Sequence, residues 1–162
     1  MHQQGHEGHG GMSPEMVRRH YLLLGVNLIV SLAIMYVVMF AMIASWGEFI
    51  QNINFFYMAL MMWAPMGALM LLTMPLMYPN KKLNMALYAI FGLVLILSTV
   101  GIREQSLVGD RQFLRSMIPH HSGAVLMCTK ASITDPEIKR LCNGIIASQT
   151  SEIDQMQAML AR

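Results

Sequence analysis

The chain has 162 residues, of which 55% are hydrophobic and only 12% are charged. Soluble domains usually carry about twice this share of charged residues, and Glu48 is the only ionised side chain between His20 and Lys81. This composition excludes an ordinary soluble domain and indicates an all-α protein with helices in a membrane. The net charge of +2 is too small and too dispersed to indicate binding to nucleic acid.

The first segment, residues 1–17, contains histidines and glycines but almost no large aliphatic side chain. Such a segment cannot bury a core, so we expect a disordered tail. Its histidines, His2, His6 and His9, either collect metal or are solvated side chains without a role. Ser13 followed by Pro14 is a typical helix start, with Ser13 as the N-cap and Pro14 in the first turn.

The second segment, residues 18–104, contains three apolar stretches separated by short polar loops. The stretches cover residues 21–45, 55–78 and 83–102. Each is long enough to cross a bilayer as a helix, which takes roughly 20 residues. We therefore predict a three-helix transmembrane domain that contacts membrane lipid.

Basic residues predict the orientation, because loops on the cytoplasmic side of a membrane are enriched in lysine and arginine. Two arginines precede the first apolar stretch, the first loop has no basic residue, and the second loop has Lys81 and Lys82. This pattern places the amino terminus in the cytoplasm and the carboxyl-terminal segment outside it. Three arginines after the third stretch, Arg103, Arg111 and Arg115, argue for the opposite orientation.

Methionine occurs eighteen times, and it recurs at every fourth position of the second apolar stretch. The residues are Met58, Met62, Met66, Met70 and Met74, with Met61 and Met77 beside them, and Met35, Met39 and Met42 of the first stretch are placed to face them. These thioethers either form a track for Cu(I) or Ag(I), which prefer soft ligands, or are flexible packing and lipid contacts. Pro65 and Pro75 are expected to bend this helix. The lack of charged side chains argues against a proton-coupled transporter.

The third segment, residues 105–162, is amphipathic and predicts an antiparallel hairpin of two helices outside the membrane. The first helix is expected over residues 109–131, with an interruption or kink at Pro119. The second is expected over residues 136–160, with Thr134 or Asp135 as its cap. Folding the chain between them brings Gln149 and Glu152 near a pair of adjacent histidines. Glu152 then either orients an imidazole that binds metal or only satisfies a buried histidine.

Residues 116–128 hold those two histidines together with two methionines and a cysteine. On a helix, Met117, His121 and Cys128 fall on one stripe, and His120 and Met127 fall on a neighbouring one. All five side chains can give a lone pair to a soft metal. The alternative is a buried helix with a polar pair near its start.

The pattern DxxFLxxMIPHHxGAVxM over residues 110–127 is followed by DPEIKxL and IIxxQxxEIxxM over residues 135–156. In this order and spacing it resembles the domain-of-unknown-function 305 family, over about residues 109–160. The resemblance implies a ferritin-like helical fold and a periplasmic location at the cytoplasmic membrane of a bacterium. It also implies Cu(I) or Ag(I) as the bound metal. The ligands that it implies are Met117, His120, His121, Met127 and Met156.

This chain departs from the family pattern in two respects. Many soluble members have two hairpins that complete a four-helix bundle, so a homodimer is expected to build the bundle from two single hairpins here. Cys128 and Cys142 stand where the family would have alanine. They either form a disulfide, bind soft metal or remain inert buried thiols.

The function predicted from these features is a membrane-anchored Cu(I)- or Ag(I)-binding protein that handles copper outside the cytoplasmic membrane. The alternative is a structural membrane module in which the hairpin mediates assembly and the histidines are packed without metal. We do not expect an enzyme, because a ferritin-like di-iron site needs several inward carboxylates and a Glu-x-x-His pattern. Glu152 alone lies at depth in the predicted hairpin.

Overall fold

The computed structural model describes residues 12–162, so the histidines predicted in the tail lie outside the described residues. Within residues 12–162 the fold is entirely helical, which confirms the all-α class. The α-helices are α1 (Pro14–Val38), α2 (Ile53–Thr73), α3 (Lys81–Arg103), α4 (Asp110–Lys130) and α5 (Pro136–Leu160). Two 3-10 helices, η1 (Met39–Met42) and η2 (Trp46–Glu48), lie between α1 and α2.

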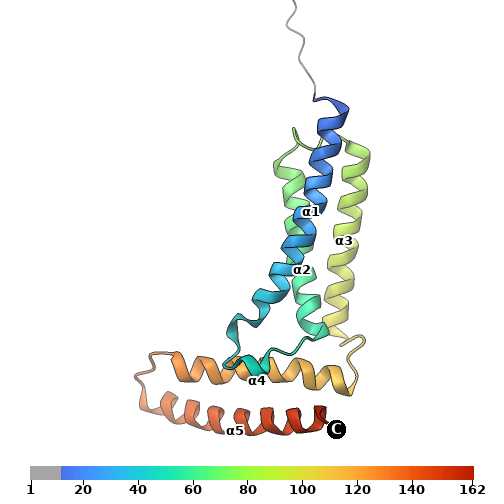
Figure 1. Cartoon of the computed structure of the whole chain (residues 1–162). Coiled ribbons are helices and arrows are strands. Elements are labelled where there is room, and N and C mark those ends of the chain that lie inside the picture. Colours follow the sequence, from blue (N-terminus) through green and yellow to red (C-terminus); the bar gives the residue numbers. More distant parts are fainter. Residues whose placement is uncertain (1–11) are drawn as a thin grey trace, which may run out of the picture.

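Three of the described helices are long and apolar enough to cross a membrane: Pro14–Met42, Ile53–Thr73 and Lys81–Arg103. They stand side by side as a bundle, and α4 and α5 lie across the end of that bundle farthest from the start of α1 (Figure 1). α4 lies between the bundle and α5, so each of its faces has a different neighbour (Figure 1). This placement of α4 decides where the site forms.

Capping residues explain why the helices begin where they do. The Ser13 hydroxyl accepts a hydrogen bond from the Met16 amide at 3.3 Å, as its sequence position predicts. At the start of α5, Asp135 accepts bonds from the amides of Glu137 and Ile138, so Asp135 rather than Thr134 is the cap. Because α1 begins at Pro14, residues 14–17 are helical and are not part of the predicted tail.

The prolines behave differently from one another. Pro65 lies inside α2, but that helix ends at Thr73, and Pro75 follows in a turn instead of bending the helix. α4 continues through Pro119 without interruption. A proline lacks the amide that would continue the helical hydrogen bonds, so each position is tolerated only where neighbouring contacts compensate.

Small residues set the packing of the three-helix bundle. Buried Ala59, Ala64 and Gly67 of α2 let the neighbouring helices approach closely, which is typical of helices that pack within a membrane. The core joins Leu24 and Leu28 of α1 to Phe91 of α3 around α2. The outward side chains are mostly exposed and apolar, as a bilayer requires.

Candidate metal centre

The adjacent histidines point to different surroundings. Their ring centroids lie 6.0 Å apart and the ring planes differ by 65°. His121 is buried where α4 packs on α5, whereas His120 is exposed on the side of α4 that faces the three-helix bundle. The candidate ligand set therefore divides into two groups on two faces of one helix.

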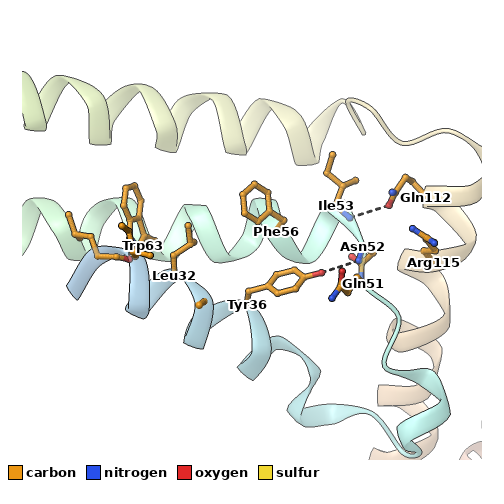
Figure 2. A pocket seen from close by; sticks show the side chains of 12 residues that line it. Leu32, Tyr36, Gln51, Asn52, Ile53, Phe56, Trp63, Gln112 and Arg115 are labelled. Atoms are coloured by element: carbon orange, nitrogen blue, oxygen red, sulfur yellow. Dashed lines mark hydrogen bonds between the residues drawn. The ribbon is translucent and has the colours of Figure 1, made fainter. Parts of the chain in front are cut away.

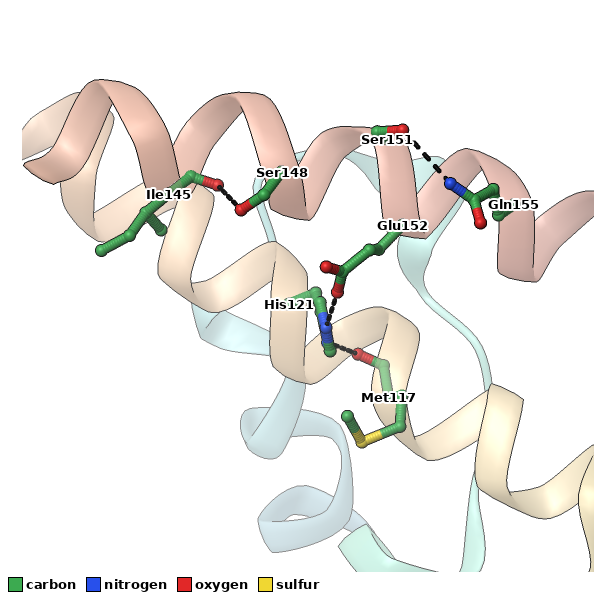
Figure 3. A network of polar contacts seen from close by, with 7 residues as sticks. All are labelled: Met117, His121, Ile145, Ser148, Ser151, Glu152 and Gln155. Atoms are coloured by element: carbon green, nitrogen blue, oxygen red, sulfur yellow. Dashed lines mark hydrogen bonds and ion pairs between the residues drawn. The ribbon is translucent and has the colours of Figure 1, made fainter.

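His121 is fully engaged by hydrogen bonds (Figure 3). Its Nδ1 lies 2.9 Å from the carbonyl oxygen of Met117, which can only accept, so Nδ1 is the donor. Its Nε2 lies 2.7 Å from Oε2 of Glu152 on α5. Both ring nitrogens therefore have hydrogen-bond partners within the protein, and the contact with Glu152 joins α4 to α5.

Met117 and Met156 belong to the apolar packing around that pair. Met156 is buried in a cluster with Ile118 and Ile153, and Met117 packs against its edge. Gln149, on the same helix as Glu152, is half-buried, and its Oε1 has no hydrogen-bond partner among residues 12–162. These residues shape the interface between α4 and α5.

His120 and Met127 line a cavity of about 460 Å³ on the opposite face of α4. We call this the junction cavity, because its other walls come from the end of α1, from η1 and from the start of α2. Three further methionines line it: Met39, Met42 and Met58. The remaining lining residues are Val38, Ile43, Phe55, Pro119, Gly123 and Ala124. One imidazole and four thioether side chains thus line the same cavity.

Ser122 holds the junction cavity together. Its hydroxyl donates a hydrogen bond to Glu48 and accepts one from the Ala44 amide at 2.6 Å. The same Glu48 carboxylate accepts from the Ser45 amide at 2.9 Å, which fixes η2. These contacts tie the loop between α1 and α2 to the middle of α4.

Gly123 extends that contact, since a Cβ at this position would lie 3.6 Å from the carbonyl oxygen of Met42, an ordinary van der Waals distance. α4 and η1 therefore pack directly against each other at Gly123. The Ser122–Gly123 pair, next to the histidines in sequence, therefore sets the position of Met42 relative to His120.

Cys128 and Cys142 form a disulfide, with their Cα atoms 5.2 Å apart. The bond joins the last turns of α4 to the second turn of α5. In this form neither sulfur is a thiolate, so the cysteines contribute no ligand to a metal.

No group of three or more His, Cys, Asp or Glu side chains in residues 12–162 lies close enough together to hold an ion. The junction cavity has no carboxylate in its lining. Its donors are soft and uncharged, which suits Cu(I) and Ag(I) better than Ca²⁺, Mg²⁺ or Zn²⁺.

Sequence reasoning did not foresee that Met39, Met42 and Met58 line one cavity with His120 and Met127. The methionine spacing was visible, but it indicated either a soft-metal track within the membrane or flexible packing and lipid contacts. The link depends on the contact between Ser122 and Glu48, which are 74 residues apart. No periodicity in the sequence encodes a contact of that kind.

Comparison with known proteins identifies the carboxyl-terminal part. The family model "Domain of unknown function (DUF305)" matches residues 102–160. The chain is also similar to Uncharacterized protein L153 of Acanthamoeba polyphaga mimivirus, at 34% identity over 117 residues that cover 70% of this chain and 74% of that protein. No solved structure matches significantly. The chain belongs to the DUF305 family.

Proposed function

We propose that this protein binds Cu(I) or Ag(I) at the membrane surface, in the junction cavity. The observation that carries the proposal is the convergence of His120 with Met39, Met42, Met58 and Met127 around one space. Soft thioether and imidazole donors select these monovalent ions over hard cations.

The absence of charge on the donors of the cavity also favours a monovalent ion. All five donors are neutral when they bind a metal, so the bound ion keeps its full charge in a largely apolar lining. The cost of burying charge rises steeply with its size. A monovalent ion is therefore better tolerated than a divalent one.

The residues implied by the family resemblance take two roles in this proposal. His120 and Met127 bind the metal. Met117, His121 and Met156 instead hold α4 against α5, and Glu152 fixes His121. Gln149 belongs to the same interface between α4 and α5, and its Oε1 has no hydrogen-bond partner within the described residues.

The proposed location is the outer face of a cytoplasmic membrane. A disulfide persists in oxidising compartments outside the cytoplasm, and the Cys128–Cys142 bond supports that side for α4 and α5. The site would then collect copper or silver arriving from outside. A second copy of the chain is proposed to pack on α5, where Ile138 and Leu141 are exposed, and to complete a ferritin-like bundle.

The test is a Cu(I) competition titration against a chromophoric chelator, using the full chain in detergent. His2, His6 and His9 are replaced by alanine in every sample, so that the tail adds no nitrogen ligands. In this background, His120→Ala and Met127→Leu should each weaken Cu(I) binding at least about tenfold, equivalent to about 1.4 kcal/mol.

The matched control is Met85→Leu, at a methionine of α3 that is 70% exposed and outside the cavity. It should leave the affinity unchanged. Equal affinity in the parent and in His120→Ala would remove the basis for a metal site. The assembly module without metal would then be the better account.

A further inference from the structure

A second cavity, of about 650 Å³, opens between α1 and α2 and is separate from the junction cavity. Figure 2 shows α1 diverging from α2 as both approach α4, which leaves a trough along the bundle. Its apolar walls are Leu28, Ile29, Leu32 and Ala33 of α1 with Phe56 and Trp63 of α2. The Trp63 indole N–H donates to the carbonyl oxygen of Leu28 at 2.7 Å and closes the far end.

The end of the trough nearest α4 is polar (Figure 2). Gln51, Asn52, Gln112 and Arg115 line it, together with the hydroxyl of Tyr36. Asn52 is occupied as the cap of α2, where it accepts from the Phe55 amide at 2.9 Å. The Gln112 oxygen accepts from the Ile53 amide at 3.3 Å, which leaves its amide N–H group for a ligand.

Arg115 supplies a positive charge at this polar end. Among residues 12–162 the one ion pair is His121–Glu152, so no carboxylate neutralises Arg115 there. A guanidinium beside a free amide N–H group is a donor pair suited to the oxygens of an anion.

We propose that the trough binds an anionic phospholipid, with one acyl chain along α1 and α2 and its phosphate at Arg115. Two observations support this occupant. The apolar walls belong to helices that are long and apolar enough to cross a membrane, so an acyl chain enters the trough from the side. The charge of Arg115 complements the headgroup, as basic pockets between membrane helices do for anionic lipids.

Native mass spectrometry of the full chain in detergent tests this, with phosphatidylglycerol and phosphatidylcholine of identical acyl chains as probes. Phosphatidylglycerol should bind more tightly to the unmodified chain. Arg115→Gln should weaken it about fivefold, the change expected for one basic contact at a membrane surface, and leave phosphatidylcholine unaffected. Arg111→Gln is the matched control, because Arg111 is exposed on the same helix outside the trough.

Ala33→Trp, which fills the apolar part of the trough, should reduce binding of both lipids. Equal affinity of the unmodified chain for the two lipids would overturn the proposal without any variant. The same loss in Arg111→Gln as in Arg115→Gln would overturn it too. Displacement of the lipid by glycerol phosphate at similar concentration would assign the polar end to a small anion instead.

Discussion

His120 and His121 face different neighbours because successive residues of an α-helix are rotated by about 100° around its axis. His121 turns toward α5, where its Nε2 lies 2.7 Å from Oε2 of Glu152. His120 turns toward the three-helix bundle and the thioethers of the junction cavity. The sequence alone predicted that both belong near Glu152 or a metal, but not which histidine takes which partner.

The His121→Ala variant separates the two roles. Removing the ring breaks a hydrogen bond to a carboxylate and should destabilise the packing of α4 on α5 by about 1–3 kcal/mol. The lower part of that range is expected, because the Glu152 side chain is 52% exposed and its charge is screened by water. Hydrogen–deuterium exchange in α5 should rise, while Cu(I) affinity changes less than about threefold.

His120→Ala is the control for that experiment and should show the reverse pattern. It should lower Cu(I) affinity and leave exchange in α5 unchanged. A loss of Cu(I) affinity in His121→Ala as large as in His120→Ala, with unchanged exchange in α5, would mean that His121 binds the metal.

The disulfide is the other residue-scale feature that the sequence left open. Helix phasing predicted that both cysteines point inward, but the stagger between two helices is uncertain by a few residues from spacing alone. The structure brings the two Cα atoms to 5.2 Å, within the range that a disulfide spans.

Replacing Cys128 and Cys142 together by serine should cost about 3 kcal/mol of α4–α5 stability, the usual effect for a closed loop of roughly 15 residues. The native chain should resist iodoacetamide until a reductant is added, and then accept two labels. Labelling of native protein without reductant would show that the thiols are free, and metal ligation by cysteine would have to be reconsidered.

At the scale of the elements, the sequence predicted the helices well because their ends carry local signals. Ser13, Asp135 and Pro136 fixed helix starts within a residue or two. The second crossing was drawn too long, to residue 78, because hydropathy continues past the point where Pro75 prevents a helix. Hydropathy measures only a residue's preference for solvent, so it does not detect where a helix ends. α2 ends before residue 78 because Pro75 cannot donate the backbone hydrogen bond that would continue it.

The close approach of neighbouring side chains to α2 at Gly67 predicts that a larger residue at this position destabilises the bundle. A Cβ there would lie 2.5 Å from Cζ of Phe91 and 3.1 Å from Cδ2 of Leu28. Gly67→Ala should therefore destabilise the bundle by about 1–3 kcal/mol through overpacking. The midpoint of thermal aggregation in detergent measures the effect.

Gly92→Ala is the matched control, because a Cβ at that position of α3 meets nothing within 4 Å. Phe91→Leu should restore stability to Gly67→Ala by removing the clashing ring edge. Equal midpoints for Gly67→Ala and Gly92→Ala would show that α2 and α3 are farther apart than described.

At the scale of the whole molecule, the arrangement of α4 on the bundle was not predictable. Sequence periodicity showed that α4 has two faces, but the loop that covers one of them is attached through Ser122 and Glu48. That attachment brings methionines of η1 and α2 together with His120 and Met127 of α4 around one cavity. Long-range pairing of this kind depends on tertiary packing, which local patterns do not contain.

α4 and α5 lie at the end of the bundle opposite the start of α1 (Figure 1). We therefore predict that these two helices and the start of α1 lie on opposite sides of the membrane. A periplasmically active reporter should work when fused after Arg162, and a cytoplasmic reporter should work when fused before Met1. Strong cytoplasmic reporter activity at the carboxyl end would reverse the orientation, and the proposed capture of metal from outside would fail with it.

The most direct test of the metal site is X-ray absorption at the copper edge, on the full chain with His2, His6 and His9 replaced by alanine and loaded with one equivalent of Cu(I). The junction cavity predicts a shell of thioether sulfurs with one imidazole nitrogen. His120→Ala should lose the nitrogen and keep the sulfurs. A shell of nitrogen and oxygen alone, or the same spectrum in His120→Ala, would contradict the assignment of copper to this cavity.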